Sequence, residues 1–301
     1  MQKNERMRKQ FKDEVFSGHI VRMMVAPDAL AAKIAESNGA QAVFSAGYAS
    51  SASALAMPDR EIADFGLILE RAREIINAVN IPVFVDADTG YGDEQNIPRT
   101  TQAIEEIGAA GMFLEDQTWP KRCGHMDGKT VEPTEILEKK IRIAKASRRH
   151  DNFLIMSRTD ARAVYGLSDA IQRSRRYKEA GADLIFIEAP RSYDELKEIH
   201  DAFPTTPMMA NMIEGGKTPL LKAQELEKLG FNIVVHPTAM TYTQAYAEEK
   251  LIQNIQQTGT TEGYEDKMIT FSKFNQFVGL DKINARDAEY SPENMKKYMI
   301  N

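Results

Sequence analysis

The chain has 301 residues, of which 43% are hydrophobic and 27% charged, a balance typical of globular proteins and unlike that of disordered, collagen-like or coiled-coil chains. Lysine and arginine total 38 and aspartate and glutamate 44, so the net charge is −6, and the even spread of both signs argues against nucleic acid as a partner. The first residues contain no apolar run resembling a signal peptide, and the sequence contains no uncharged apolar run of about 18 residues. Cys123 is the single cysteine. We therefore expect a cytoplasmic protein with no membrane partner and no internal disulfide.

A helical segment at residues 5–17 opens the chain. Short runs rich in Val, Ile, Phe and Met then alternate with longer segments of helical period, which is typical of parallel βα units. Strands are predicted at residues 20–25, 42–45, 82–86, 111–115, 153–157, 183–187, 207–210 and 232–236. The clearest helices are predicted at residues 62–79, 133–147, 168–180, 192–203 and 223–229, with two more in the tail at 241–257 and 266–278.

Eight such units in about 250 residues predict an α/β fold, a (β/α)8 barrel of the TIM type. A doubly wound sheet is the alternative, because periodicity alone does not show closure. We expect residues 1–301 to form a single barrel domain, with an N-terminal helical extension at 1–19 and a C-terminal helical extension at 240–301. Extra helices outside a barrel usually cover its end or pair subunits.

Almost every predicted strand ends on a polar residue. The C-terminal ends of barrel strands form the rim at which barrel enzymes carry their chemistry. The polar residues at these ends are Asp86, Asp88, Glu115, Asp116, Arg158, Asp160, Glu188, Asn211 and His236. We therefore expect an active site at this rim.

Asp86 and Asp88 are the first candidates for a metal site. They are two residues apart, so on an extended backbone both carboxylates point to the same side. Two like charges held together need a cation, and oxygen ligands without a Cys/His cluster favour Mg²⁺ or Mn²⁺ held partly through water. A helix N-cap or an Asx turn before Gly90 is the alternative, but Glu115 on the neighbouring strand favours the metal.

Residues 121–125 place the single thiol among Lys121, Arg122 and His125, inside a polar stretch at 117–130. Cationic neighbours lower the pKa of a thiol, so Cys123 is a candidate nucleophile or general acid/base. A lone cysteine is more often inert, but this one lies in a polar loop, which indicates exposure and a lid over the barrel mouth. The run Glu-Gly-Gly-Lys-Thr at 214–218 is not a P-loop, because the first glycine of that pattern would fall on Asn211.

Five segments, taken together and in order, resemble the isocitrate lyase/phosphoenolpyruvate mutase superfamily over about residues 20–280. They are Asp86-Ala87-Asp88-Thr89-Gly90-Tyr91-Gly92, Glu115-Asp116-Gln117, Lys121-Arg122-Cys123-Gly124-His125, Ser157-Arg158-Thr159-Asp160-Ala161 and Asn211-Met212-Ile213-Glu214-Gly215-Gly216-Lys217-Thr218-Pro219. The third segment resembles the lyase branches, methylisocitrate lyase and 2,3-dimethylmalate lyase. The last segment resembles the dimethylmalate lyase and petal-death-protein group.

The resemblance implies roles for individual residues. Asp86 would ligate Mg²⁺ (or Mn²⁺), and Asp59, Asp88 and Glu115 would hold its water shell. The implied catalytic residues are Cys123, Lys121, Arg122, His125, Arg158 and Glu188. The implied substrate-binding residues are Ala46, Gly47, Tyr48, Gly124, His125, Arg158, Glu188 and Asn211. Ala46 stands where the family has a serine that, with the following glycine, grips a carboxylate, so one hydroxyl contact is missing.

The implied reaction is metal-dependent cleavage of a 2-hydroxy dicarboxylic or tricarboxylic acid, of the 2,3-dimethylmalate or methylisocitrate type. The products would be a 2-oxo acid such as pyruvate and a carboxylic acid, with Cys123 protonating the departing carbon. A carboxylate or a metal-bound water would take the hydroxyl proton. The alternatives are an oxaloacetate hydrolase, a carboxyphosphonoenolpyruvate-type phosphonomutase and a non-catalytic barrel. The family also implies a homo-oligomer, dimer or tetramer, with C-terminal helices swapped between subunits.

Overall fold

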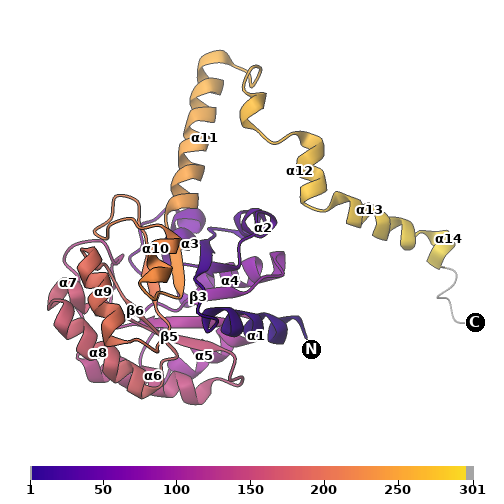
Figure 1. Cartoon of the computed structure of the whole chain (residues 1–301). Coiled ribbons are helices and arrows are strands. Elements are labelled where there is room, and N and C mark those ends of the chain that lie inside the picture. Colours follow the sequence, from indigo (N-terminus) through magenta and orange to yellow (C-terminus); the bar gives the residue numbers. More distant parts are fainter. Residues whose placement is uncertain (1, 296–301) are drawn as a thin grey trace, which may run out of the picture. The chain divides into compact units, whose positions relative to one another are not determined.

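The computed structural model describes residues 2–295 (Figure 1). The chain divides into two compact units, Met1–Thr243 and Gln244–Asn301. The boundary lies close to residue 240, where the C-terminal extension is predicted to begin. The first unit contains the eight strands described below.

Eight parallel strands form the centre of the first unit, and each lies within two residues of its predicted bounds. They are β1 (Val21–Val25), β2 (Ala42–Ser45), β3 (Val83–Asp86), β4 (Gly111–Glu115), β5 (Leu154–Thr159), β6 (Leu184–Ile187), β7 (Met209–Asn211) and β8 (Ile233–His236). Their order is β6-β5-β4-β3-β2-β1-β8-β7, and a parallel bridge between Ile185 and Met208 brings the two edges together. The sheet is a nearly closed barrel, so the TIM-type prediction is confirmed over the doubly wound sheet.

Helices between the strands surround this barrel (Figure 1). They are α2 (Ala29–Ser37), α3 (Gly47–Leu55), α4 (Phe65–Ala78), α5 (Ile97–Glu106), α6 (Thr134–Ser147), α7 (Ala161–Val164), α8 (Leu167–Ala180), α9 (Tyr193–Ala202) and α10 (Ala223–Lys228). Successive strand residues point alternately inward and outward. In β3, for example, Phe84 belongs to the cluster inside the barrel, whereas Val83 and Val85 pack against the helices outside it.

The helix α1 (Lys3–Val15) covers the N-terminal end of the barrel. Its residues Phe11 and Val15 belong to the interior cluster, and the ring centroids of Phe11 and Phe84 are 5.6 Å apart. With that end covered by apolar side chains, the C-terminal ends of the strands are left for the polar loops.

The second unit is helical. It contains most of α11 (Ala239–Thr258), followed by η1 (Glu265–Lys267), α12 (Phe271–Phe277), α13 (Leu280–Glu289) and α14 (Pro292–Met295). The predicted continuous helix at 266–278 is wrong, because Thr270 is extended and its side chain caps α12 by accepting from the Lys273 N–H. Among the helices of residues 2–295, none is both long and apolar enough to cross a membrane. Exchange of these helices between subunits stays a prediction.

Candidate active site

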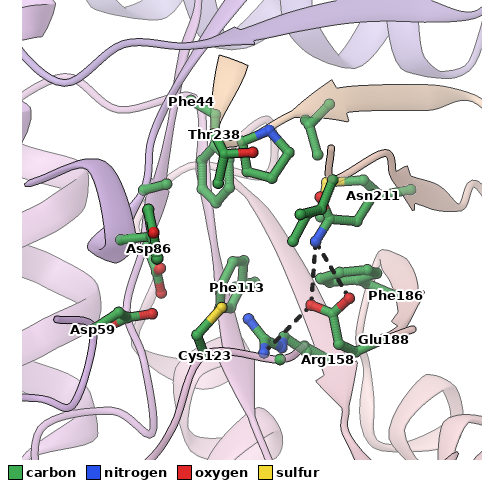
Figure 2. Close-up of a pocket in the computed structure, with 17 residues that line it drawn as sticks. Phe44, Asp59, Asp86, Phe113, Cys123, Arg158, Phe186, Glu188, Asn211 and Thr238 are labelled. Carbon is green, nitrogen blue, oxygen red and sulfur yellow. Dashed lines mark hydrogen bonds and ion pairs between the residues drawn. The ribbon is translucent and has the colours of Figure 1, made fainter. Parts of the chain in front are cut away.

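A cavity lies at the C-terminal ends of the strands. Its lining includes the polar residues Tyr48, Asp59, Asp86, Cys123, Arg158, Glu188, Asn211 and Thr238. Figure 2 shows Asp59 and Asp86 on one side of the cavity and Arg158 and Glu188 on the other, with Cys123 between them. The site therefore has an acidic wall and an opposite wall that carries a guanidinium.

The acidic wall is built on the end of β3. The backbone N–H groups of Gly47 and Asp88 donate to the two carboxylate oxygens of Asp86, each at 2.9 Å. Asp88 itself has a left-handed backbone, with φ of 45°, and its Oδ2 accepts from the Tyr91 hydroxyl at 2.7 Å. Burial, and next to it the charge of Asp88, raises the pKa of Asp86 to about 7. The wall is thus crowded with carboxylates.

Lys121, on the loop between β4 and α6, contacts this acidic wall. Its Nζ is 2.6 Å from Asp59 Oδ1 and 2.6 Å from Asp88 Oδ1, and the side chain is buried. Although burial alone would lower it, the pKa of Lys121 lies well above its ordinary value because of Asp59 and Asp88. The ammonium group therefore neutralises part of the acidic wall and ties the loop to it.

The donor set of this wall fits a hard divalent cation. Buried Glu115 Oε1 has no hydrogen-bond partner within residues 2–295, whereas its Oε2 lies 3.2 Å from Arg158 Nη1, and burial raises the pKa of Glu115 well above its ordinary value. Among the described residues, no three Asp, Glu, His or Cys side chains enclose a metal directly. Mg²⁺ commonly keeps several waters and takes only one or two carboxylates. Asp86 as ligand, with Asp59, Asp88 and Glu115 acting through water, suits such an ion.

The opposite wall is centred on Arg158, at the end of β5. Its Nε donates to Asp160 Oδ2 at 2.9 Å, and its Nη2 is 3.4 Å from Glu188 Oε2. The guanidinium carbon lies 5.6 Å from the ring centroid of Phe113 and 5.5 Å from that of Phe186, so apolar rings hold the side chain from within the barrel.

Glu188 is held by donors on several sides. Asn211 Nδ2 lies 3.2 and 3.3 Å from its two oxygens, His125 Nε2 lies 3.1 Å from Oε1, and its own neighbour Ala189 donates a backbone N–H at 2.9 Å. Although burial opposes it, Arg158 lowers the pKa of Glu188. A Cβ at Gly124 would lie 2.4 Å from Glu188, so only glycine lets the loop approach this carboxylate.

Cys123 lies on the loop between β4 and α6 and is half-buried. The expected low thiol pKa is wrong: burial raises the pKa of Cys123 to about 11. The cationic neighbours do not act on the thiol as predicted, because Lys121 is paired with Asp59 and Asp88 and Arg122 Nη1 donates to the Asp127 carbonyl. The thiol is therefore neutral near pH 7, which suits a proton donor better than a nucleophile.

The remaining predicted residues are distributed around the site. Ala46 and Tyr48 line the cavity, and the Tyr48 and Tyr242 hydroxyl oxygens are 3.1 Å apart. The N–H of Gly47 donates to Asp86, so it positions that carboxylate. Arg122 and His125 lie outside the cavity lining, the first within the loop and the second behind Glu188.

Two features were not predicted. Lys129 is buried, contacts the Gly124 carbonyl and donates to Asp160 at 2.7 Å; nothing in the polar loop sequence marks it. The apolar lining includes Phe113 and Phe186, each two residues before a predicted site carboxylate, Glu115 and Glu188. Residues two apart in a strand share a face, so that spacing could have identified both rings.

Comparison with known proteins identifies the family of the chain. The phosphoenolpyruvate phosphomutase family matches residues 12–256. The chain is 44% identical to 2,3-dimethylmalate lyase of Eubacterium barkeri, over 90% of this chain and 94% of that one. It is 38% identical to the probable 2-methylisocitrate lyase 1 of Corynebacterium glutamicum, over 94% and 92% of the two chains.

Several solved structures have a fold similar to that of this chain. A crystal structure of 2,3-dimethylmalate lyase, a PEP mutase/isocitrate lyase superfamily member, aligns with a TM-score of 0.89 at 28% identity, covering 98% of this chain and 97% of that one. Oxaloacetate acetylhydrolase with 3,3-difluorooxalacetate aligns with a TM-score of 0.87 at 28% identity, covering 94% and 95%. Phosphonopyruvate hydrolase with oxalate and Mg²⁺ aligns with a TM-score of 0.86 at 27% identity, covering 96% and 99%. The chain belongs to the phosphoenolpyruvate phosphomutase family, within the PEP mutase/isocitrate lyase superfamily.

Proposed function

We propose that this protein is a divalent-metal-dependent carbon–carbon lyase. It cleaves a 2-hydroxy dicarboxylate of the 2,3-dimethylmalate type into pyruvate and propionate, with Cys123 as the proton donor. The observation that carries the proposal is a neutral thiol between an acidic wall and the Arg158 wall of one cavity. The two relatives compared above are both named as lyases.

The reaction breaks the C2–C3 bond, removes the proton of the C2 hydroxyl and adds a proton to C3. The C2–C3 bond breaks while the C2 hydroxyl gives its proton to a carboxylate of the acidic wall, so that a C2 carbonyl forms and the bonding electrons remain on C3. Cys123 then gives its S–H proton to C3, and propionate leaves. A thiol whose pKa is near 11 is protonated at neutral pH and is acidic enough to quench a carboxylate enediolate.

A divalent cation, Mg²⁺ or Mn²⁺, would supply Lewis-acid stabilisation at the oxygen of C2 when it is bound. Asp86 would hold it directly, and Asp59, Asp88 and Glu115 through water. The charges around the cavity support the need for a divalent cation, because the positive charge of Arg158 is already surrounded by the carboxylates of Asp160, Glu115 and Glu188. A dianionic substrate therefore needs further positive charge next to these carboxylates.

The cavity lining favours a substrate with two carboxylates and small alkyl groups. Among the described residues that line it, Arg158 is the only cation. The apolar part of the lining includes Phe44, Phe113, Phe186, Met209, Ile213 and Val235. A metal and one guanidinium can bind two carboxylates, whereas a third carboxylate, as in methylisocitrate, would face apolar groups at a cost in desolvation.

The test is proton NMR of the purified protein with Mg²⁺ and either 2,3-dimethylmalate, methylisocitrate or oxaloacetate. We expect pyruvate and propionate from the first substrate, and a loss of about 100-fold or more in kcat for Cys123→Ser, which removes the general acid. Binding of the dicarboxylate by this variant should persist. Succinate formed from methylisocitrate would show that the substrate is the tricarboxylate. If the wild type leaves all three compounds unchanged, the proposal is contradicted.

Oxaloacetate hydrolysis is the second candidate, because a solved oxaloacetate acetylhydrolase shares the fold at 28% identity. In that case the same NMR experiment would give oxalate and acetate, and only from oxaloacetate.

We also propose that the protein is a homo-oligomer, a dimer or tetramer in which the second unit packs against another copy. No residue of α11 is buried. Large apolar side chains of the second unit are exposed, including Ile252, Ile269, Phe271 and Ile283. Exposed apolar surface of this extent is typical of a subunit interface.

A further inference from the structure

We propose that the turn at Gly216 and Lys217 is a positioning element for the loop that carries Cys123. The backbone N–H of Lys217 fixes the tautomer of His125, and this contact holds the loop closed against Glu188. The inference rests on the proposed function for the role of Cys123, whereas the tautomer and the closure of the loop can be measured without turnover.

The two partners of the His125 ring agree on one tautomer. The Lys217 backbone nitrogen is 2.9 Å from His125 Nδ1, and a backbone N–H can only donate, so Nδ1 accepts and carries no proton. The proton of the neutral ring is then on Nε2, which lies 3.1 Å from Glu188 Oε1. A carboxylate oxygen is an acceptor, so this second contact needs the same tautomer.

Gly216 makes room for the ring. A Cβ at this position would lie 2.5 Å from His125 Nδ1 and 2.9 Å from Cε1. The φ of Gly216 is outside the left-handed region, so alanine fits the backbone there, and its Cβ would conflict mainly with the imidazole, with Ile213 Cβ next at 3.0 Å. The glycine is therefore required by the contact with His125.

The first part of the turn, next to β7, is held by two hydrogen bonds. The Gly216 N–H donates to the Ile213 carbonyl at 3.0 Å, and the Thr238 hydroxyl, just after β8, donates to Glu214 Oε2 at 2.6 Å. Asn211, at the end of β7, contacts Glu188 from the same chain segment. One stretch of chain thus holds both Glu188 and the histidine that donates to it.

His125 transmits this contact to Cys123. The Met126 N–H donates to the Cys123 carbonyl at 2.9 Å, so the thiol and the imidazole belong to one tight turn of the loop. Displacing the ring from Lys217 should therefore release the thiol to solvent. Lys217 also forms an ion pair with Asp127, but the Asp127 side chain is 94% exposed and such pairs contribute little.

The first test is ¹⁵N NMR of the intact wild-type protein labelled on its histidines, with His125→Asn to assign the signal. We expect the Nε2–H tautomer for His125 in the absence of substrate. A proton found on Nδ1 would overturn the inference, and this measurement needs no variant to be active.

The second test is the rate at which iodoacetamide alkylates Cys123 in the full chain. Gly216→Ala should raise this rate about tenfold, the equivalent of one lost hydrogen bond, and should lower kcat more than it raises KM. Gly66→Ala, at an exposed helical glycine, is the matched control and should leave the rate unchanged.

Lys217→Ala separates the N–H from the ion pair, because it keeps the backbone donor and removes the ammonium. We expect an alkylation rate within about threefold of wild type. An effect as large as that of Gly216→Ala, or no effect of a folded Gly216→Ala protein, would overturn the role of the Lys217 N–H.

Discussion

The Nζ of Lys121 lies 2.6 Å from Asp88 Oδ1, with the two side chains only 1% and 3% exposed. Lys121 comes from the loop that carries Cys123, whereas Asp88 follows β3 in the acidic wall. This buried ion pair, together with that between Lys121 and Asp59, therefore joins the loop with the proposed proton donor to the proposed metal site. Loop closure and the charge of the metal site depend on each other for this reason.

Lys121→Met should destabilise the metal-free protein by about 3 kcal/mol, because it leaves buried carboxylates without their cation. Mg²⁺ should restore part of this loss by supplying positive charge, so the rise in Tm on adding Mg²⁺ should be larger for the variant than for the wild type. Thermal unfolding with and without Mg²⁺ measures this difference.

The control is Lys139→Met, which removes an ion pair with Glu94 in which both side chains are more than a third exposed. It should change neither Tm nor the response to Mg²⁺ appreciably. Equal Mg²⁺ responses of the wild type and Lys121→Met would contradict the coupling between loop and metal site.

The alkylation of Cys123 should have an unusual pH dependence. Burial raises the thiol pKa to about 11, and only the thiolate reacts. The alkylation rate should therefore rise about tenfold per pH unit from pH 8 to beyond pH 10. In unfolded protein, the control, the same rate should level off above about pH 9, near the ordinary pKa of a thiol. A plateau near pH 8 in the folded protein would show an activated thiolate instead.

The fold was predictable because strand and helix periods differ and each βα unit repeats them. The polar residues that meet in the cavity were predictable for a related reason: Asp86, Arg158, Glu188 and Asn211 lie at or just after the C-terminal ends of parallel strands, which meet at one rim. Position along a strand thus fixed their place.

The state of Cys123 was not predictable in this way. The pKa of Cys123 depends on the burial of the thiol and on the position of the Lys121 charge. Both depend on the conformation of the irregular loop at 117–130, whose sequence lacks the periodicity of a helix or strand. The same holds for Lys129, whose contact with Asp160 joins residues 31 apart in the chain. Side chains on irregular loops are placed by tertiary contacts, which a single sequence does not show.

Asp160 should contribute a pH-dependent part of the stability. Although burial opposes it, Arg158 and Lys129 lower the pKa of Asp160 from 3.8 to about 2. A lowered carboxyl pKa stabilises the folded state above the unfolded pKa, and this contribution is lost as pH falls through the folded pKa. The difference in free energy of unfolding between the wild type and Asp160→Asn should be constant above about pH 4 and narrow by about 2 kcal/mol toward pH 2.

Urea unfolding of both proteins from pH 6 downward measures this narrowing. Asp201→Asn is the control, because Asp201 pairs with Lys197 at an exposed site and should give a small difference at every pH. A difference for Asp160→Asn that stays constant as pH falls below 4 would show that Asp160 has an ordinary pKa.

The proposed oligomer depends on apolar side chains of the second unit. Phe271, at the start of α12, is 87% exposed in the single chain, and burying a phenylalanine contributes about 2 kcal/mol. If this unit packs against another copy, Phe271→Asp should shift the protein toward smaller species at micromolar concentration. Light scattering coupled to size-exclusion chromatography measures the mass.

Ser272→Asp, the neighbouring exposed position, introduces the same charge without removing an apolar group and should keep the wild-type mass. A monomeric wild type, or equal masses for the wild type and Phe271→Asp, would mean that this side chain does not hold subunits together.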